Sequence, residues 1–149
     1  MNIPNDFKEF IELLNDHKVR YLIVGGYAVG FYSRPKFTNY LDIWIDNSDE
    51  NALKMVNVLQ LFGFAGLGLS TTDFTDSNQV IQLGVAPIRI DLLTGLGIPF
   101  NSAYRQKVKG RYFGVEAHFV SRKDLIELKK QAGRKKDLDD IDWMHTYSE

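Results

Sequence analysis

Short apolar runs and amphipathic stretches alternate along the chain, and the two patterns predict different elements. Runs rich in β-branched and aromatic residues are typical of strands. They predict strands over residues 21–24, 40–45, 79–83, 88–93, 111–115 and 117–120. Within 40–45, alternation with period two places Tyr40 and Asp42 on one face of the strand, opposite Leu41 and Ile43.

Apolar residues three or four positions apart predict helices between these strands. The first helix has an expected N-cap at Asn5 or Asp6, and Ser48 and Ser121 have the side chains of further N-caps. Gly63 is expected to follow the end of the helix that Ser48 begins, and Gly133 the end of the helix that Ser121 begins. Other helices are expected over 27–32, from 101 or 102 to about 107, and from about 137 to 147, whereas 65–78 is predicted to be a loop.

Strands and helices are interleaved, and we find no repeat, linker or low-complexity segment. We therefore predict a single domain over residues 1–149 of α+β (α/β-like) class. Its mixed central β-sheet should be flanked by helices and followed by a short C-terminal helical segment.

Composition narrows the classes of function. The 18 Lys+Arg and 19 Asp+Glu give a net charge of −1, which argues against a general polyanion binder. The absence of cysteine excludes a disulfide scaffold, a zinc–thiolate site and a cysteine nucleophile. No apolar run approaches the roughly 20 residues of a membrane helix, and the N-terminus lacks a signal-peptide pattern. We expect a cytoplasmic protein without a membrane partner.

Two glycines and two isolated carboxylates are candidates for chemistry. Gly25 and Gly26 lie between a strand and a helix, where the backbone can approach a ligand closely, although a tight turn requires the same residues. Asp42 and Asp91 each interrupt an apolar strand, where a carboxylate is costly unless it faces a cation. A salt bridge or a sheet-edge position would explain either residue alone. If the two strands are neighbours, the carboxylates can meet on one face.

A basic stretch is the remaining candidate. Residues 129–136 contain five positive charges, and acidic residues follow directly. One interpretation is a solvated helix end with local ion pairs. Another is a clamp for a triphosphate. A third is an RNA-binding surface, whose affinity would fall steeply with salt and would not depend on Asp42.

In this order, the motifs resemble the polymerase-beta-like nucleotidyltransferase superfamily and are similar to small bacterial AbiEii/AbiGii-toxin-type nucleotidyltransferases. The motifs are Val24-Gly25-Gly26-Tyr27-Ala28, the approach from Arg34-Pro35-Lys36-Phe37 to Thr38, the strand Tyr40-Leu41-Asp42, and Arg89-Ile90-Asp91. Segments 121–129 and 133–141 are similar to the C-terminal part of that family.

The resemblance implies a nucleotidyltransferase fold and transfer of a nucleoside monophosphate from an NTP to an acceptor with Mg²⁺. It implies that Asp42 and Asp91 are the catalytic, metal-binding residues. It also implies a nucleotide-binding set that consists of Gly25, Gly26, Arg34, Thr38, Lys129 and Arg134. The acceptor stays open between tRNA, a protein and a small molecule, and a homo-oligomer could complete the cleft.

One position departs from the family pattern. Tyr40 stands where the family has the first Asp of Asp-x-Asp, and a phenol with a pKa near 10 is a poor magnesium ligand. Asp46 lies on the same face of the strand as Asp42, but it is about 13 Å further along, which is too far for the two carboxylates to share a metal. The two-metal site could therefore be reduced to one metal. The alternative is a catalytically degenerate nucleotide-binding or toxin–antitoxin regulatory module.

Overall fold

The computed structural model describes residues 1–35 and 38–147, which form a mixed β-sheet with helices on both faces. The sheet has six strands in the spatial order β3-β4-β2-β1-β6-β5. β2 runs parallel to β4 and β1 runs parallel to β6, whereas the other three pairs are antiparallel. The bounds are β1 (Tyr21–Val24), β2 (Tyr40–Ile45), β3 (Val80–Val85), β4 (Ile88–Leu93), β5 (Val108–Tyr112) and β6 (Val115–Phe119). The predicted α+β class with a mixed sheet is confirmed.

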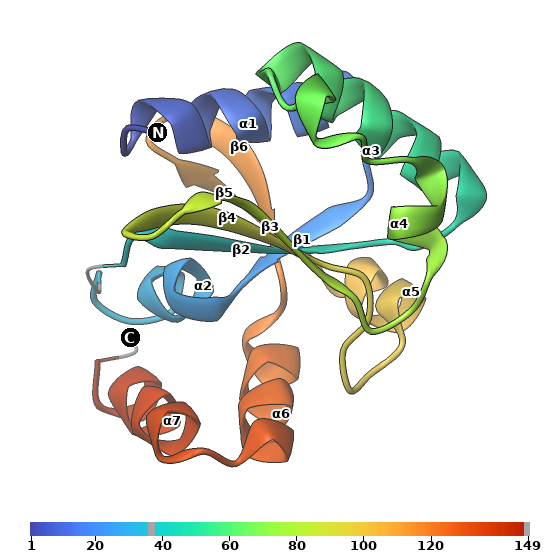
Figure 1. Ribbon diagram of the computed structural model, residues 1–149. Coiled ribbons are helices and arrows are strands. Elements are labelled where there is room, and N and C mark those ends of the chain that lie inside the picture. Colours follow the sequence, from blue (N-terminus) through green and yellow to red (C-terminus); the bar gives the residue numbers. More distant parts are fainter. Residues whose placement is uncertain (36–37, 148–149) are drawn as a thin grey trace.

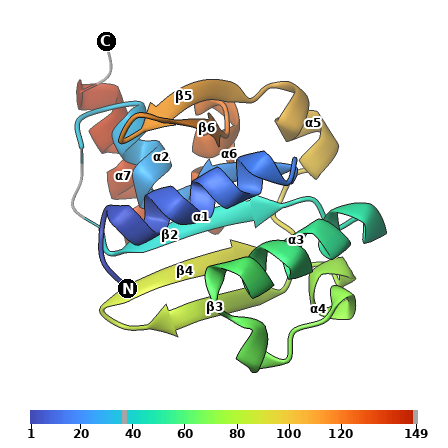
Figure 2. The same ribbon diagram turned by 90° about the horizontal axis from the view of Figure 1, so that it is seen from above.

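Two layers of helices enclose this sheet (Figure 1). One layer contains α1 (Asn5–Asp16) and α3 (Asp49–Phe62), and Figure 2 shows both crossing the sheet on that side. The other contains α2 (Gly25–Phe31), α6 (Arg122–Ala132) and α7 (Lys135–Tyr147), with the short α5 (Phe100–Arg105) nearby. The α1 stripe is fully buried, as its spacing predicts, and consists of Phe7, Phe10, Ile11 and Leu14.

Helix boundaries follow the expected capping chemistry at α3 and α6. Ser48 Oγ accepts a hydrogen bond from the Asn51 amide, and Ser121 Oγ accepts one from the Asp124 amide. Gly63 and Gly133 follow the two helices in the left-handed conformation that glycine adopts most readily. These caps confirm the predicted starts and ends.

Four local predictions were wrong. Pro4, and neither Asn5 nor Asp6, is the N-cap of α1, because the Asp6 carboxylate instead accepts a hydrogen bond from the Asn2 amide. The helix expected over 27–32 is α2 at 25–31. The strand expected over 111–115 is β5 at 108–112, and Val115 instead begins β6 after a turn at 113–114. The predicted loop 65–78 contains the 3-10 turn η1 (Ala65–Leu67) and α4 (Thr71–Thr75).

The α4 segment has its own physical explanation. Ser70 and Asp73 form a reciprocal capping box, and Phe74 is completely buried. The buried Phe74 ring and the hydrogen bonds that cap the N-terminal end of α4 are enough to hold this single helical turn against α3. Among the described helices, none has both the length and the apolar character that crossing a membrane requires.

Candidate functional site

The two strand carboxylates lie directly opposite each other. The parallel register of β2 and β4 pairs Asp42 with Asp91, and also pairs Tyr40 with Arg89. Neighbouring strands are about 4.8 Å apart, and paired residues project from the same face. This face is the one covered by α2, because Asp42 lies against Gly25. The chain fold therefore brings together two carboxylates that are 49 residues apart in the sequence.

Gly25 is required for this close approach. Its φ is +68°, and a Cβ at this position would overlap the Asp42 carboxylate oxygen Oδ2. A side chain here would be strained by the backbone and excluded by Asp42. The next residue, Gly26, is less tightly enclosed, since a Cβ there would lie 3.2 Å from Thr38 Cγ2 and a shift of a few tenths of an ångström would admit it. The two glycines thus place the start of α2 against Asp42 and Thr38.

Arg89 neutralises one carboxylate of the pair. Its Nε and Nη2 atoms lie 2.7 and 3.0 Å from the two carboxylate oxygens of Asp91, a bidentate arrangement. The guanidinium carbon also lies 4.3 Å from the centre of the Tyr40 ring. The Arg89 side chain is therefore fixed between Tyr40 and Asp91. Period-two alternation alone puts Arg89 on the face of Asp91, so the sequence carried a signal for this contact that our interpretation did not use.

Asp42, by contrast, accepts no hydrogen bond from any described residue. Burial and the neighbouring Asp91 raise the pKa of the Asp42 carboxyl to about 6, against the opposing effect of Lys136 and Lys129. A carboxylate that is partly buried and close to a second one is electrostatically unfavourable without a cation. Among the described residues, the negative charge of Asp42 is therefore balanced only in part, by Lys136, Lys129 and Arg89.

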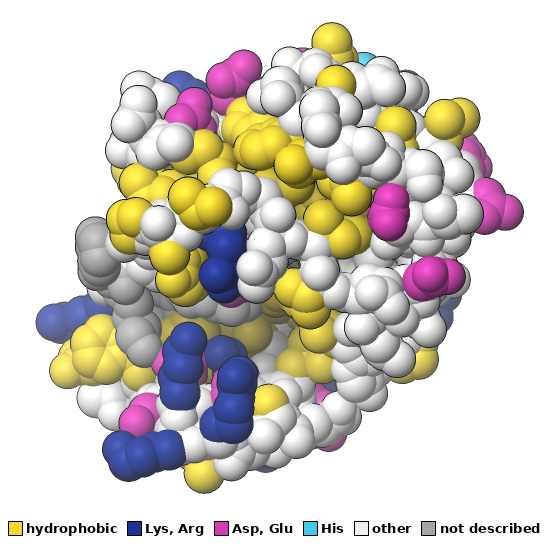
Figure 3. Space-filling view, in the orientation of Figure 1, with side chains coloured by type: hydrophobic (Ala, Val, Ile, Leu, Met, Phe, Trp, Pro, Cys, Tyr) yellow, Lys and Arg dark blue, Asp and Glu magenta, His cyan; other side chains and the backbone are white. Residues whose placement is uncertain are grey.

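The C-terminal helices supply further positive charges (Figure 3), which gather across a recess from the sheet. Lys129 Nζ lies 2.9 Å from Asp140 Oδ2 and 3.4 Å from Asp137 Oδ1, and Arg134 Nε lies 2.7 Å from Asp137 Oδ2. Both acids are buried, and the pKa of Asp137 is lowered by its hydrogen bond from Arg134. Much of the charge of the basic stretch is thus matched locally.

Lys136 is the positive group that acts most strongly on Asp42, and its side chain is exposed. The sequence interpretation included Lys136 in the basic stretch 129–136 but assigned nucleotide binding only to Lys129 and Arg134. A helical periodicity places neighbouring lysines on different faces of the α6–α7 corner, but only the packing of α7 against α2 decides which one faces the sheet.

The segment before β2 contacts both the Gly25–Gly26 turn and Tyr40. Thr38 Oγ1 accepts a hydrogen bond from the Tyr40 amide at 3.2 Å, so Thr38 lies between Gly26 and Tyr40. Arg34 lies further out, with its guanidinium 4.9 Å from the Tyr147 ring centre and its carbonyl accepting a hydrogen bond from Trp143 Nε1. Positions 36 and 37 of the motif lie outside the described residues.

The donor set fits one divalent cation rather than two. Two carboxylates side by side, one without a hydrogen-bond donor, are the oxygen ligands that magnesium takes together with water and phosphate. Within residues 1–35 and 38–147 there is no group of three or more His, Cys, Asp or Glu side chains that could hold a metal. Position 40, which would supply a third carboxylate, presents a phenol ring beneath Arg89.

Comparisons of the chain with protein-family models and with curated proteins give no match. Solved structures do match. The lincomycin-bound crystal structure of the lincosamide antibiotic adenylyltransferase LnuA has 12% sequence identity and a TM-score of 0.60, over 95% of this chain and 96% of that one. A Thermotoga maritima protein assigned as a nucleotidyltransferase, at 1.87 Å resolution, has 12% identity and a TM-score of 0.60, over 98% and 96% of the two chains. The chain therefore has the nucleotidyltransferase fold.

Proposed function

We propose that the chain binds a nucleoside triphosphate with one Mg²⁺ ion at Asp42 and Asp91 and transfers a nucleoside monophosphate to an acceptor hydroxyl. The observation that carries the proposal is the in-register pairing of the two carboxylates beside the close-fitting Gly25. The fold shared with an adenylyltransferase over nearly the whole chain supports a nucleotide as substrate.

Each residue of the proposed site would have its own role in binding the ion and the triphosphate. Asp42 and Asp91 would hold the ion, Gly25 and Gly26 would let the triphosphate approach, and Lys136 would add positive charge opposite Asp42. The further residues that we propose for nucleotide binding are Thr38, Arg34, Lys129 and Arg134. The bound ion would neutralise charge on the phosphates.

The proposed step is an in-line displacement at phosphorus. The acceptor hydroxyl oxygen forms a bond to the α-phosphorus, and the bond from that phosphorus to the bridging oxygen breaks. The electron pair leaves with pyrophosphate, and the hydroxyl proton passes to solvent.

Calorimetry with Mg²⁺ and each nucleoside triphosphate tests this proposal. We expect binding that requires Mg²⁺ and is lost in Asp42→Asn and Asp91→Asn. The matched control is Asp139→Asn, because Asp139 is 61% exposed and pairs with Lys135 on α7. Absence of binding by the native chain, or equal binding by all four proteins, would remove the site assignment.

A second function is favoured by one specific contact. Arg89 stacks on Tyr40 and holds Asp91, so the position that would complete a two-metal site is filled by an aromatic ring and a cation. The chain would then bind nucleotides without turnover, as a regulatory module of the toxin–antitoxin kind. Turnover by the native chain, measured as pyrophosphate release with candidate acceptors, contradicts this function. Turnover that appears only in Tyr40→Asp supports it.

A further inference from the structure

Four side chains form a block of two adjacent pairs on the face of the sheet that carries the candidate site. The parallel register of β2 and β4 pairs Asp42 with Asp91 and Tyr40 with Arg89. Residues two positions apart on a strand project from the same face, so all four side chains lie on one side of the sheet. A permanent cation and an aromatic ring therefore stand directly beside the two carboxylates.

Arg89 is held in this block from two sides. Its guanidinium donates to both carboxylate oxygens of Asp91, and its central carbon lies 4.3 Å from the centre of the Tyr40 ring. The bidentate pairing fixes the plane of the guanidinium, and the ring supports its flat face. The Arg89 amide also donates to the Asn39 carbonyl at 3.1 Å, which ties the start of β4 to the residue before β2. The position of this charge is therefore set before a ligand binds.

One edge of the guanidinium is left without a partner. A guanidinium carries five N–H groups, and Asp91 takes one from Nε and one from Nη2. The Nη1 atom donates to no described residue, yet it is not enclosed, because the buried polar atoms without partners lie on other residues. The Arg89 side chain as a whole is 22% exposed. A ligand can therefore reach the free donors of Arg89 without displacing Asp91.

The free donors and the charges of the block both match a phosphate group. The planar arginine fork is suited to the oxygens of carboxylates and phosphates, and one carboxylate is already bound at its other edge. Burial raises the pKa of Asp42, and Arg89 is one of the cations that oppose this rise. Within the block, Arg89 thus matches one of two negative charges. One divalent ion together with an anionic phosphate group would complete the balance.

We propose that Arg89 is a further nucleotide-binding residue, whose free edge binds an oxygen of the triphosphate while its other edge supplies Asp91 with a resident cation. This role rests on the nucleotide site of the proposed function, and it adds a phosphate contact from β4. It also makes Arg89 a competitor of a divalent cation for Asp91 as long as no phosphate is bound. A divalent cation alone therefore binds weakly, and the cation and the triphosphate bind together.

Calorimetry with Mg²⁺ and inorganic triphosphate tests the phosphate contact, because this probe carries the phosphates of a nucleotide without its base or sugar. We expect binding by the native chain that requires Mg²⁺. Arg89→Met should bind the probe at least about tenfold more weakly, because methionine keeps an unbranched side chain but has no N–H donor and no charge. Equal affinity of Arg89→Met and the native chain would overturn the proposal.

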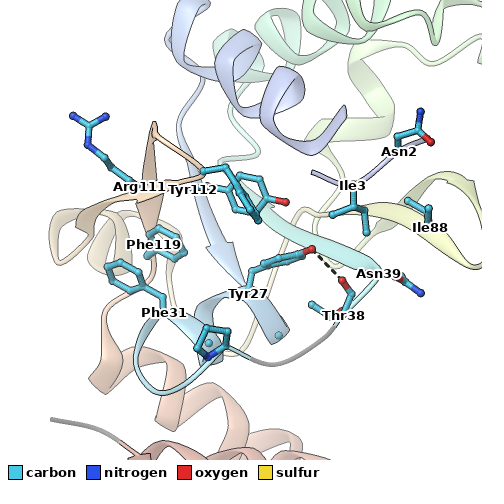
Figure 4. A pocket seen from close by; sticks show the side chains of 14 residues that line it. Asn2, Ile3, Tyr27, Phe31, Thr38, Asn39, Ile88, Arg111, Tyr112 and Phe119 are labelled. Atoms are coloured by element: carbon cyan, nitrogen blue, oxygen red, sulfur yellow. Dashed lines mark hydrogen bonds between the residues drawn. The ribbon is translucent and has the colours of Figure 1, made fainter. Parts of the chain in front are cut away.

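Arg111→Met is the matched control. Arg111 is exposed on the edge strand β5, and its guanidinium donates to the Gly114 carbonyl at 2.8 Å. Figure 4 shows this side chain across a cavity from Thr38 and Asn39, the two residues before β2. The substitution removes the same charge outside the block, so the affinity for the probe should stay within about twofold of the native value. A loss as large as in Arg89→Met would show that net charge alone sets the affinity, and it would overturn the proposed contact.

Binding of Mn²⁺ alone separates a phosphate contact from a merely structural role of Arg89. Without Arg89, the two neighbouring carboxylates lack their resident cation, so Arg89→Met should bind Mn²⁺ at least about threefold more tightly than the native chain does. The electron paramagnetic resonance signal of the free ion measures this affinity. A variant that had lost its fold, or the position of Asp91, would bind the ion more weakly. Equal or weaker binding of Mn²⁺ would therefore overturn the proposal.

Asp42→Asn, measured with the same probe, separates this proposal from the proposed function. If Asp42→Asn loses the Mg²⁺-dependent binding and Arg89→Met keeps it, the nucleotide site stands and the role of Arg89 alone is refuted. If the native chain does not bind the probe, or Asp42→Asn binds it equally well, the site of the proposed function is refuted, and with it the role of Arg89. Loss of probe binding in both variants, with tighter Mn²⁺ binding only in Arg89→Met, supports both proposals.

Discussion

Asp42→Asn should make the folded protein more stable at alkaline pH while it removes cation binding. The Asp42 carboxylate accepts no hydrogen bond from the described residues and faces Asp91 across one strand pair. The amide of asparagine has the same shape but carries no charge. The substitution therefore removes electrostatic repulsion and little packing.

The magnitude follows from the pKa. The pKa of Asp42 is raised from 3.8 to about 6, first by burial and then by Asp91. Each unit corresponds to about 1.4 kcal/mol, so ionised Asp42 destabilises the folded state by up to about 3 kcal/mol. Because the folded-state pKa is raised, this cost is fully present above pH 6, shrinks as the pH falls from 6 towards 4, and is absent below the unfolded-state value.

Urea unfolding of the native chain and of Asp42→Asn, in chelator and at pH values from 8 to 4, measures the difference. The variant should be more stable by about 1–3 kcal/mol at pH 8, and the difference should vanish near pH 4. Added Mg²⁺ should stabilise only the native chain, by about 2.7 kcal/mol at a concentration one hundred times its Kd. Asp139→Asn on the exposed face of α7 should show neither effect.

Two results would refute this reasoning. Equal or lower stability of Asp42→Asn at pH 8 would show that Asp42 is not under electrostatic strain in the folded chain. A stability difference that stays constant from pH 8 to 4 would show that the effect comes from packing rather than from charge.

Three further substitutions test the framework of the site. Gly25→Ala should lower the free energy of unfolding in urea by at least about 2 kcal/mol, because backbone strain at φ +68° adds to the overlap with Asp42. The control is Gly63→Ala, at φ +100° with open space around it, which should cost only the backbone strain of about 1–2 kcal/mol. Lys129→Met should cost about 3–5 kcal/mol at pH 8 in the same assay, because two buried carboxylates of α7 lose their shared cation. Asn51→Ala should cost about 3 kcal/mol by thermal unfolding, since the side chain is 2% exposed and makes hydrogen bonds of 2.8, 3.1 and 2.8 Å to backbone groups.

The sequence predicted the strands that carry the carboxylates, because Asp42 and Asp91 stand out against apolar neighbours in strands of clear alternation. It could not predict that these strands are adjacent. β4 pairs with β2 although β3 precedes it in the chain, and β1 and β6 complete the other half of the sheet. Such pairings are set by how helices cover both faces, which no local pattern records.

Contacts between side chains were the least predictable part. The Arg89 contact to Asp91 depends on rotamer choice beside Tyr40, and the Lys129 contacts depend on the packing of α7 against α6. The predicted loop over 65–78 failed for a different reason. A single capped turn with Phe74 as its one buried ring is too short to produce a periodic signal.

The near-zero net charge has a structural reason that bears on function. Positive and negative groups around the site are already matched within the chain, Asp91 by Arg89, and Asp137 and Asp140 by Lys129. Asp42 is the carboxylate of this region without a hydrogen bond from the described residues, and Lys136 is the exposed cation that acts on it most strongly. A ligand that brings both a divalent cation and anionic phosphates would satisfy the two groups together. A nucleotide without the ion would meet the charge of Asp42 directly, so binding that requires Mg²⁺ follows from the same charges that raise the pKa of Asp42.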